Sequence, residues 1–473
     1  MLLEADWVLP ISSSPIRDGS VCVERGAIEE VGGSSDLRAA RPNEQRREFP
    51  GCVLLPGLIN AHTHLEYSAF RGFARQSGFG EWMLRLLLAR RKLAAADYGV
   101  SALWGARECV RGGVTYIADT AFEGWTTARA AVAAGLRARV YLEAFGIDDA
   151  RLPQTMSNLE ARLDALRAEG GPRVEWGLSP HAPYTVSRRL YREIARFARM
   201  NGLRVATHVA ESQAEVDFLG AGSGPLAAAY RGAKMWKGER WAPPGIRPVE
   251  YLESAHALGP ELLAVHCVQV EDSEIALLAE RQVAVAHCPR SNLRLECGVA
   301  PVAEFVEAGL AVGLGTDSAA SNDSLDVFAE MRAALTLSRA RAAGAPVDGA
   351  APVATPLTAE QVLDMATLGG ARALGLDREL GSLERGKAAD MIVIRRPGDL
   401  RGWGGGRRQG TDAQPESEAS LAQVLVTRTT AADVQLVMIG GRVVYDAGSS
   451  AAGAEDEVDL AFQEVRGKLG LSG

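Results

Sequence analysis

Residues 53–64 of the chain are VLLPGLINAHTH, an apolar run with a Pro-Gly turn that ends in two of the seven histidines. Side chains at positions i and i+2 of a strand point to the same side, so His62 and His64 can bind a single ion from one face. Such a pair needs further ligands before it indicates a metal site. Those ligands must come from other parts of the chain.

Seven further stretches have the apolar composition of short buried strands. Alanine- and arginine-rich segments with helical periodicity, such as residues 127–138 and 186–202, separate them. With residues 53–64 they make eight strand-then-helix units, which predicts an α/β fold, a closed (β/α)8 TIM barrel over residues 56–374. The seven predicted strands are 114–119, 138–144, 174–180, 203–210, 262–268, 283–289 and 310–317.

The two ends of the chain do not show this alternation of strands and helices. Residues 20–33 alternate as two strands around Arg25-Gly26, and β-branched runs return at 387–396 and 434–448, with Gly440-Gly441 as a hairpin turn. We therefore expect a small β-sandwich domain built from both termini, followed by a C-terminal helix. The expected limits are 1–55 with 375–450 for the small domain and 451–473 for the helix.

Two segments are longer than simple connections. Residues 220–248 follow the fifth predicted strand and are interpreted as a lid over the pocket. Residues 398–420 are rich in glycine and polar side chains, which predicts a surface loop inside the small domain.

The composition is that of a folded globular protein, with 47% hydrophobic and 23% charged residues among 473. A formal net charge of −8 argues against a nucleic-acid-binding surface. Glu4 and Asp6 interrupt the start of the chain where a secretory signal would be apolar, and no run is long enough to span a membrane. We therefore expect a cytoplasmic protein without membrane or nucleic-acid partners.

The six cysteines form no C-x-x-C pair, so metal ligands must be nitrogen and oxygen atoms. In a barrel of this kind, functional groups collect at the carboxyl ends of the strands. Four side chains that can bind a metal or move a proton lie at or just after the carboxyl ends of later predicted strands: His181, His208, His266 and Asp317.

His208 and Asp317 complete, with His62 and His64, a set of three nitrogens and one carboxylate that leaves room for a water. Glu211 follows His208 closely enough to act as a proton shuttle beside that water. His266 could orient the water, and Asp317 could be both ligand and base.

A resemblance to a known family rests on six stretches, PGLINAHTH, SPHAPYTVS, THVAES, VAHCPRSNLRL, GLGTDSAASND and GSLERGKAADMIVI. In this order, from about Val53 to Arg395, they resemble the successive signatures of the amidohydrolase superfamily. They are most similar to its nucleoside deaminase branch.

The resemblance implies a role for each matching position. His62, His64, His208 and Asp317 would bind one Zn²⁺ per chain, with Fe²⁺ in some relatives. Glu211 would protonate the purine ring, His266 would hold the attacking water, and Asp317 would take part in catalysis. Further positions would contact a small-molecule nucleoside substrate: Glu81, Trp82, His181 and Ser318. In FGEWML, Glu81 would accept hydrogen bonds from the ribose hydroxyls.

The group on the 5′ carbon of the adenosine stays open. HTHLEYS, FGEWM and GIRPVEYLES are similar to aminodeoxyfutalosine deaminases of menaquinone biosynthesis, whereas CPRSNLRLECG and GTDSAASND are similar to methylthioadenosine/S-adenosylhomocysteine deaminases. Relatives often form homo-oligomers, which implies the same for this chain.

Three alternatives stay open beside this interpretation. A binuclear amide hydrolase of the superfamily would need a lysine on the fourth strand, and VEWGLSPHAPY has none. A mononuclear guanine deaminase or triazine chlorohydrolase would share most of the metal set. A scaffold with a structural zinc would normally close the site with four protein ligands and would not need Glu211 or His266.

Overall fold

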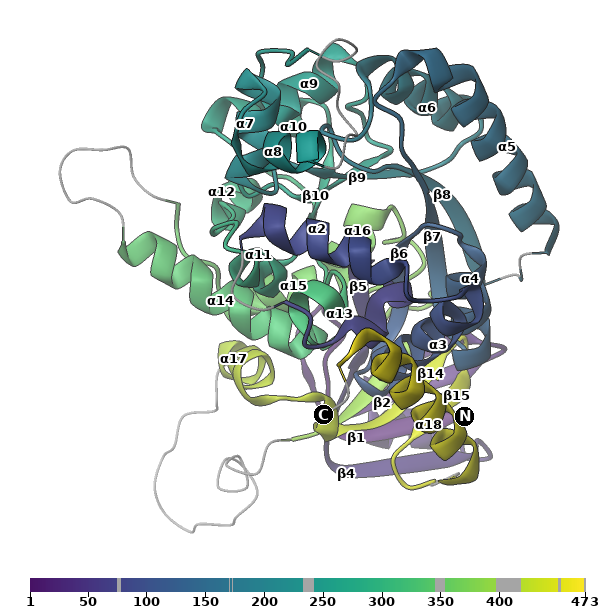
Figure 1. Cartoon of the computed structure of the whole chain (residues 1–473). Coiled ribbons are helices and arrows are strands. Elements are labelled where there is room, and N and C mark those ends of the chain that lie inside the picture. Colours follow the sequence, from purple (N-terminus) through teal and green to yellow (C-terminus); the bar gives the residue numbers. More distant parts are fainter. Residues whose placement is uncertain are drawn as a thin grey trace.

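The structure, a computed structural model, describes residues 1–74, 78–169, 171, 173–232, 242–344, 354–396, 418–449 and 452–471. Its larger part is an eight-stranded parallel sheet in the order β5 to β12 (Figure 1). The strands are β5 (Leu58–Thr63), β6 (Val114–Ala121), β7 (Arg137–Ala144), β8 (Val174–Pro180), β9 (Val205–Val209), β10 (Leu262–His266), β11 (Ala284–His287) and β12 (Val312–Leu314).

The sheet closes on itself between its first and last strands. Thr63 and Asp317 form a parallel bridge, and the Asp317 N–H donates to the His62 carbonyl oxygen at 3.0 Å. The predicted (β/α)8 barrel is therefore confirmed, and each predicted strand overlaps an observed one. β6 is buried along its whole length, as expected for a parallel strand covered on both faces.

Helices surround the barrel (Figure 1). They include α2 (Phe79–Arg90), α3 (Ala95–Arg111), α4 (Trp125–Ala134), α5 (Leu152–Glu169), α6 (Arg188–Met200), α7 (Gln213–Ala221), α8 (Gly224–Gly232), α9 (Pro248–Ser254), α10 (Asp272–Glu280), α11 (Pro289–Arg294), α12 (Val302–Glu307), α13 (Ala319–Asn322), α14 (Val327–Ala343), α15 (Ala359–Met365) and α16 (Leu368–Leu374). Short 3-10 helices η1 (Leu65–Phe70) and η2 (Asp149–Arg151) follow β5 and β7.

Helix α6 illustrates why these segments are helical. The Ser187 hydroxyl caps its first turn by accepting a hydrogen bond from the Leu190 N–H at 3.2 Å. Its buried side chains recur at helical spacing and include Leu190, Ile194 and Ala198. The arginines between them face outward, so the helix packs one apolar stripe against the barrel.

Both ends of the chain contribute to one second sheet, in the order β15-β14-β13-β4-β1-β2-β3. Its strands are β1 (Leu2–Val8), β2 (Ile16–Glu24), β3 (Ala27–Gly33), β4 (Arg46–Pro56), β13 (Met391–Arg395), β14 (Val434–Ile439) and β15 (Arg442–Asp446), with α1 (Ser34–Ala40) and η4 (Ala431–Asp433) between strands.

We expected a β-sandwich here, but the hydrogen bonds join all seven strands into a single mixed sheet. The reason is that β4 pairs with β1 on one side and with β13 on the other, which connects the N-terminal and C-terminal strands directly. The predicted turn between β14 and β15 is present, with Gly440 and Gly441 at φ 57° and 73°.

The chain passes from this sheet into the barrel at Gly57, between β4 and β5. A Cβ atom at this position would lie 2.1 Å from the Oγ1 atom of Thr115 in β6, so only glycine allows the start of β5 to approach β6 this closely. The short connection holds the start of β5, and with it His62 and His64, in a fixed position.

The two long segments lie partly or mostly outside the described residues. Of residues 220–248, the structure describes α8 and the start of α9 but not 233–241, and of 398–420 only 418–420, at the start of α17 (Glu418–Arg428). The predicted C-terminal helix is α18 (Ala452–Leu469), whose Phe462 ring stacks on Trp104 at 4.2 Å. Among the described residues, none of the helices combines the length and apolar character needed to cross a bilayer.

Candidate active site

A cavity of about 180 Å³ opens at the carboxyl ends of the barrel strands. His64, His208, His266 and Asp317 line it together with Glu211. The His62 side chain is 1% exposed and lies directly beside them. The six polar groups that the sequence assigns to chemistry at this rim therefore meet in one place.

The predicted ligand atoms lie at short mutual distances. The Asp317 Oδ1 atom is 3.6 Å from the Nε2 atoms of both His62 and His64, and the Nε2 atoms of His64 and His208 are 3.3 Å apart. Ligand atoms about 2.1 Å from a tetrahedral zinc would be about 3.4 Å from one another. The spacing therefore fits a single metal ion.

The hydrogen bonding around these rings also fits a metal. The buried Nε2 atom of His62 and Nδ1 atom of His64 have no hydrogen-bond partner among the described residues. His208 donates from Nδ1 to the His181 carbonyl oxygen at 2.9 Å, which leaves its Nε2 lone pair directed at the cluster. The unpartnered His62 Nε2 atom, 3.6 Å from Asp317 Oδ1, is costly to bury unless another group, such as a cation, lies beside it.

Two serines orient the carboxylate of Asp317. Its Oδ2 atom accepts hydrogen bonds from the hydroxyls of Ser291 at 2.5 Å and Ser321 at 2.7 Å, which leaves Oδ1 free to face the histidines. Burial alone would raise the pKa of Asp317, but the neighbouring side chains of His62, His266 and His64 hold it well below its usual range. Burial, followed by the charge of His62, lowers the pKa of His64 to about 3. These shifts favour an ionised Asp317 and uncharged rings of His64 and His208, the forms in which such groups bind a metal.

The backbone is strained where the strands end at this cluster. His266 and Asp317 have φ angles of 75° and 54°, and Ala210 has 51°. Such left-handed conformations are uncommon for residues other than glycine and cluster at functional sites. They turn the chain so that its side chains face the cavity.

Glu211 and His266 form the second group of the site. The His266 Nε2 atom is 3.6 Å from Glu211 Oε1, and its Nδ1 donates to Asn292 Oδ1 at 2.8 Å. Burial, the charge of Asp317 and the charge of Glu215 raise the pKa of Glu211 well above its usual value. This shift favours the protonated carboxylic acid, the form that a proton donor requires.

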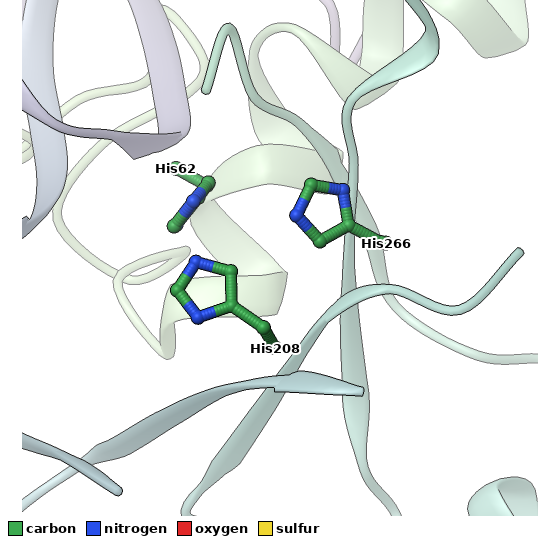
Figure 2. A group of neighbouring side chains, drawn as sticks. All are labelled: His62, His208 and His266. Atoms are coloured by element: carbon green, nitrogen blue, oxygen red, sulfur yellow. The ribbon is translucent and has the colours of Figure 1, made fainter. Parts of the chain in front are cut away.

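His266 also approaches the metal cluster. Figure 2 shows the rings of His62, His208 and His266 turned toward a common space, and one nitrogen from each lies within 4.8 Å of the others. Glu211, His266 and Asp317 offer ligand atoms within the same limit. His266 and Glu211 therefore lie where a water bound beside the cluster would meet both.

The structure brings three of the four predicted substrate contacts to the cavity. Trp82, His181 and Ser318 line it. The Trp82 indole donates to the Ala320 carbonyl oxygen at 3.1 Å, which fixes its ring in the wall. The His181 Nδ1 atom is 2.9 Å from the Thr185 hydroxyl.

Glu81 is the exception, because its side chain is exposed and does not line the cavity. Helix α2 directs Phe79, Trp82 and Met83 to the cavity, and Glu81 lies on the opposite face of the same turn. In this structure the Glu81 side chain therefore lies outside the cavity, and its contact with the ribose stays a prediction.

Sequence reasoning missed other residues of the wall. Aromatic side chains surround the space beside the metal cluster, and two charged groups, Glu143 and Arg90, face it. Glu143 could have been found, because it stands at the carboxyl end of a predicted barrel strand, where functional groups collect. The aromatic residues Tyr67, Phe145, Tyr184 and Tyr230 come from connecting segments and carry no comparable signal.

A second, wider cavity of about 1060 Å³ adjoins the first. Leu87 and Arg90 of α2 line both, so they form the wall between them. The Arg90 guanidinium lies over the rings of Tyr67 and Phe122, 5.3 and 5.2 Å from their centroids. Tyr98 and Trp125 add aromatic surface to the outer cavity.

Comparison with known proteins extends this description. The chain is 33% identical to the 5-methylthioadenosine/S-adenosylhomocysteine deaminase of Moorella thermoacetica over 456 residues, 95% of this chain and 94% of that protein. It is 34% identical to the 5'-deoxyadenosine deaminase of Methanothermobacter thermautotrophicus over 439 residues, 92% and 91% of the two chains. A crystal structure of an adenosine deaminase from Xanthomonas campestris with bound zinc has a TM-score of 0.79 at 27% identity, covering 98% of each chain.

The profile of the Amidohydrolase family matches residues 53–444, which include the whole barrel and every polar group of the cluster. The match starts at the stretch that carries His62 and His64. It continues past Asp317 into the second sheet. Together with the relatives that align over nearly the full length, it shows that the chain belongs to the amidohydrolase family.

Proposed function

We propose that this chain is a metal-dependent hydrolytic deaminase that converts the adenine of an adenosine derivative to hypoxanthine and releases ammonia. The observation that carries the proposal is the buried pair of Glu211 and His266 beside a cluster of metal-ligand type. A purely structural metal site needs neither group. The deaminase names of relatives aligned over more than nine-tenths of the chain favour this reaction over a guanine or triazine hydrolase.

Each residue of the site has its own part in the deamination reaction. His62, His64, His208 and Asp317 would hold the metal ion, which supplies the nucleophile by lowering the pKa of a water to about 7. Glu211 gives its proton to the ring nitrogen next to the attacked carbon. His266 orients the attacking water through the Nε2 atom that faces Glu211.

The second half of the reaction needs a proton on the leaving amino group. After Glu211 has protonated the ring, its carboxylate lies beside the oxygen that has added to the carbon. It takes the proton of that oxygen and passes it to the amino group, which leaves as ammonia. His181 and Trp82 hold the substrate rings against the cavity wall during these steps.

We propose Zn²⁺ as the metal, one ion per chain, with Fe²⁺ as the alternative. Three imidazole nitrogens and one carboxylate suit both ions. The relative from Xanthomonas campestris was crystallised with bound zinc. Metal analysis of the purified protein distinguishes the two ions.

The outer cavity supports a substrate with an extended 5′ group. We propose that a nucleoside whose reacting carbon lies at the metal cluster directs its 5′ substituent past Leu87 and Arg90, which line both cavities, into this space. Both S-adenosylhomocysteine and the aminodeoxyfutalosine of menaquinone biosynthesis have such extensions, whereas 5′-deoxyadenosine has none. We propose an adenosine with a long 5′ group as the preferred substrate.

The experiment that tests the function measures ammonia release and the ultraviolet change from adenine to hypoxanthine. The panel contains adenosine, 5′-deoxyadenosine, methylthioadenosine, S-adenosylhomocysteine and aminodeoxyfutalosine, and the protein is assayed for metal. We expect turnover of at least one nucleoside, with the extended ones favoured. Metal-containing protein that leaves the whole panel unchanged would contradict the proposal. Guanine and triazines would then be the substrates to test.

We further propose that the protein is a cytoplasmic homo-oligomer. All six cysteines are buried and unpaired, as in proteins of a reducing compartment. The oligomer is proposed from the family resemblance alone, and light scattering coupled to size-exclusion chromatography measures it.

A further inference from the structure

Glu330 is a buried carboxylate that the proposed reaction does not use. It stands in the first turn of α14, beside α11 and α13 (Figure 1), and its side chain is completely buried. It does not line the cavity of the metal cluster. A carboxylate removed from water in this way is costly unless neighbouring donors compensate it. The groups that donate to Glu330 therefore indicate what it does.

Both oxygens of Glu330 accept hydrogen bonds, and the donors come from two different helices. The Oε2 atom accepts from the Arg290 N–H in α11 at 3.2 Å, and the Oε1 atom accepts from Asn322 Nδ2 in α13 at 2.6 Å. The Arg290 guanidinium adds a longer hydrogen bond to Oε1, at 3.4 Å. Burial raises the pKa of Glu330 to about 7, and the charge of Arg290 is the largest influence that opposes the rise. The carboxylate thus joins α11 to α13.

The residues next to these two donors orient the carboxylate of the metal cluster. Ser291 directly follows Arg290 in α11. Ser321 directly precedes Asn322 in α13. The two serine hydroxyls donate to the Asp317 Oδ2 atom at 2.5 and 2.7 Å. A shift of either helix would therefore move one of these hydroxyls relative to Asp317.

The same two helices make further contacts with the site. His266 donates from Nδ1 to the Asn292 Oδ1 atom in α11 at 2.8 Å. Asn322 donates from Nδ2 to the Thr316 carbonyl oxygen at 2.6 Å, directly before Asp317 in the chain. The positions of α11 and α13 thus affect both a proposed metal ligand and the histidine proposed to orient the water.

We propose that Glu330 is a positioning residue, which strengthens metal binding by holding α11 and α13 where both serine hydroxyls reach Asp317. This inference rests on the metal site of the proposed function. A carboxylate accepts hydrogen bonds at both oxygens, whereas an amide has one acceptor oxygen and an NH2 group. In Glu330→Gln the NH2 group would face another donor, either the Arg290 N–H or the Asn322 amide. One of the two helices would therefore lose its hydrogen bond to α14.

The test titrates the Zn²⁺-loaded enzyme with a chelator, in the wild type and in Glu330→Gln. We expect the variant to release half of its Zn²⁺ at an about tenfold lower free chelator concentration, the lower end of the effect of losing a partner outside the ligand shell. In the metal-loaded enzyme kcat should fall, while KM should change by less than about threefold because Glu330 lies outside the cavity.

Glu274→Gln is the matched control, because it makes the same change in another buried glutamate. Glu274 is 2% exposed and accepts from the Arg247 guanidinium at 2.8 Å and from the Val249 N–H at 3.3 Å. These donors lie at the start of α9, whereas the serines that hold Asp317 lie in α11 and α13. Both variants should lower Tm, but Glu274→Gln should release Zn²⁺ as the wild type does. Equal weakening of Zn²⁺ binding in both would indicate general loosening of the barrel and overturn the role of Glu330.

A double-mutant cycle determines whether Glu330 acts through the serines. Once Ser291→Ala and Ser321→Ala have removed both hydroxyls, adding Glu330→Gln should weaken Zn²⁺ binding by less than about threefold. A further loss equal to that in the wild-type background would contradict the proposal. Should Glu330→Gln fail to fold, Glu330→Asp keeps both acceptor oxygens but retracts them by one carbon. It should weaken Zn²⁺ binding by a smaller factor and depend on the serines in the same way.

The outcomes separate this inference from the proposed function, because the titration needs no substrate. If Glu330→Gln holds Zn²⁺ as tightly as the wild type, the role of Glu330 is overturned and the deaminase proposal stands. If the wild type turns over no nucleoside, the deaminase proposal is overturned and the titration still decides the role of Glu330. A wild type that binds no metal ion overturns both.

Discussion

The Nε2 atom of His266 lies 3.6 Å from the Oε1 atom of Glu211, and both side chains are almost completely buried. Burial favours the uncharged form of each: it lowers the pKa of His266 to about 4 and raises that of Glu211 well above its usual range. The two shifts therefore favour a protonated carboxyl next to a neutral imidazole. This arrangement is the basis of the first prediction.

Glu211→Gln should keep the metal and lose turnover. Glutamine matches the shape of the protonated carboxyl but cannot give its proton to the substrate. We expect kcat to fall by about 10²- to 10⁴-fold, the usual contribution of a general acid. Metal analysis and steady-state ammonia release on the same preparation check this, and a variant with near-normal kcat would remove Glu211 from the mechanism.

Metal content should distinguish the ligands from the residue that orients the water. His208→Asn should lower metal occupancy strongly, because His208 directs its Nε2 lone pair at the cluster. His266→Asn should keep most of the metal and lose activity. Elemental analysis after equal dialysis measures both, and metal loss in His266→Asn to the level of His208→Asn would place His266 among the ligands.

Removal of the metal should destabilise the folded chain. A ligand that binds only the folded state adds about 2.7 kcal/mol at a hundredfold excess over its Kd, so chelation should lower Tm by several degrees. Calorimetry before and after dialysis against a chelator measures the change, and added Zn²⁺ should restore the original Tm. An unchanged Tm would mean that the cluster folds without help from an ion.

The free energy of unfolding should fall with rising pH because of buried carboxyls. Burial raises the pKa of Glu215 from 4.5 to about 8, and its Oε1 atom has no partner among the described residues. The folded chain therefore keeps a proton that the unfolded chain releases, and stability present below about pH 4.5 is lost as the pH rises through about 8.

Glu215→Gln should remove this part of the pH dependence. Glutamine resembles the protonated carboxyl and can still accept from the Glu211 N–H. We expect the variant to match the wild type near pH 5 and to exceed it at pH 9 by the order of one to a few kcal/mol. Urea unfolding from pH 5 to 9 measures this, with exposed Glu280→Gln as the control that should follow the wild-type curve.

Leu87→Trp should place a bulkier side chain at the border that the two cavities share. We expect kcat/KM for S-adenosylhomocysteine to fall by at least about tenfold, the range for a misfit of a few atoms in a pocket, and that for 5′-deoxyadenosine to change little. Leu88→Trp is the control, because Leu88 is 55% exposed and lines neither cavity. Equal losses on both substrates in Leu87→Trp would argue against this path for the 5′ group.

The barrel and its cluster could be predicted from the sequence because both depend on local patterns. Each barrel strand is a short apolar run, and His62, His64, His208 and Asp317 stand at or just beyond the ends of such runs, where parallel strands meet at one rim. These positions can be identified from the apolar runs along the chain, without knowing which distant segments pack together.

Other features could not be predicted because they depend on contacts between distant segments. The face of α2 that meets the cavity is chosen by the packing of Phe79 and Trp82, which turned Glu81 outward. The pairing of β1 with β4 made one mixed sheet instead of a sandwich. The two serine hydroxyls that hold Asp317 come from two separate helices, α11 and α13, and no sequence pattern joins them.

The closure of the barrel between Thr63 and Asp317 has a consequence for biosynthesis. These two residues are 254 positions apart, so the nascent chain presents His62 and His64 long before Asp317 leaves the ribosome. Four ligands cannot surround one ion until the last strand docks beside the first. The complete set of four ligands therefore forms only when β12 has docked beside β5, which makes metal binding a late event in the folding of the barrel.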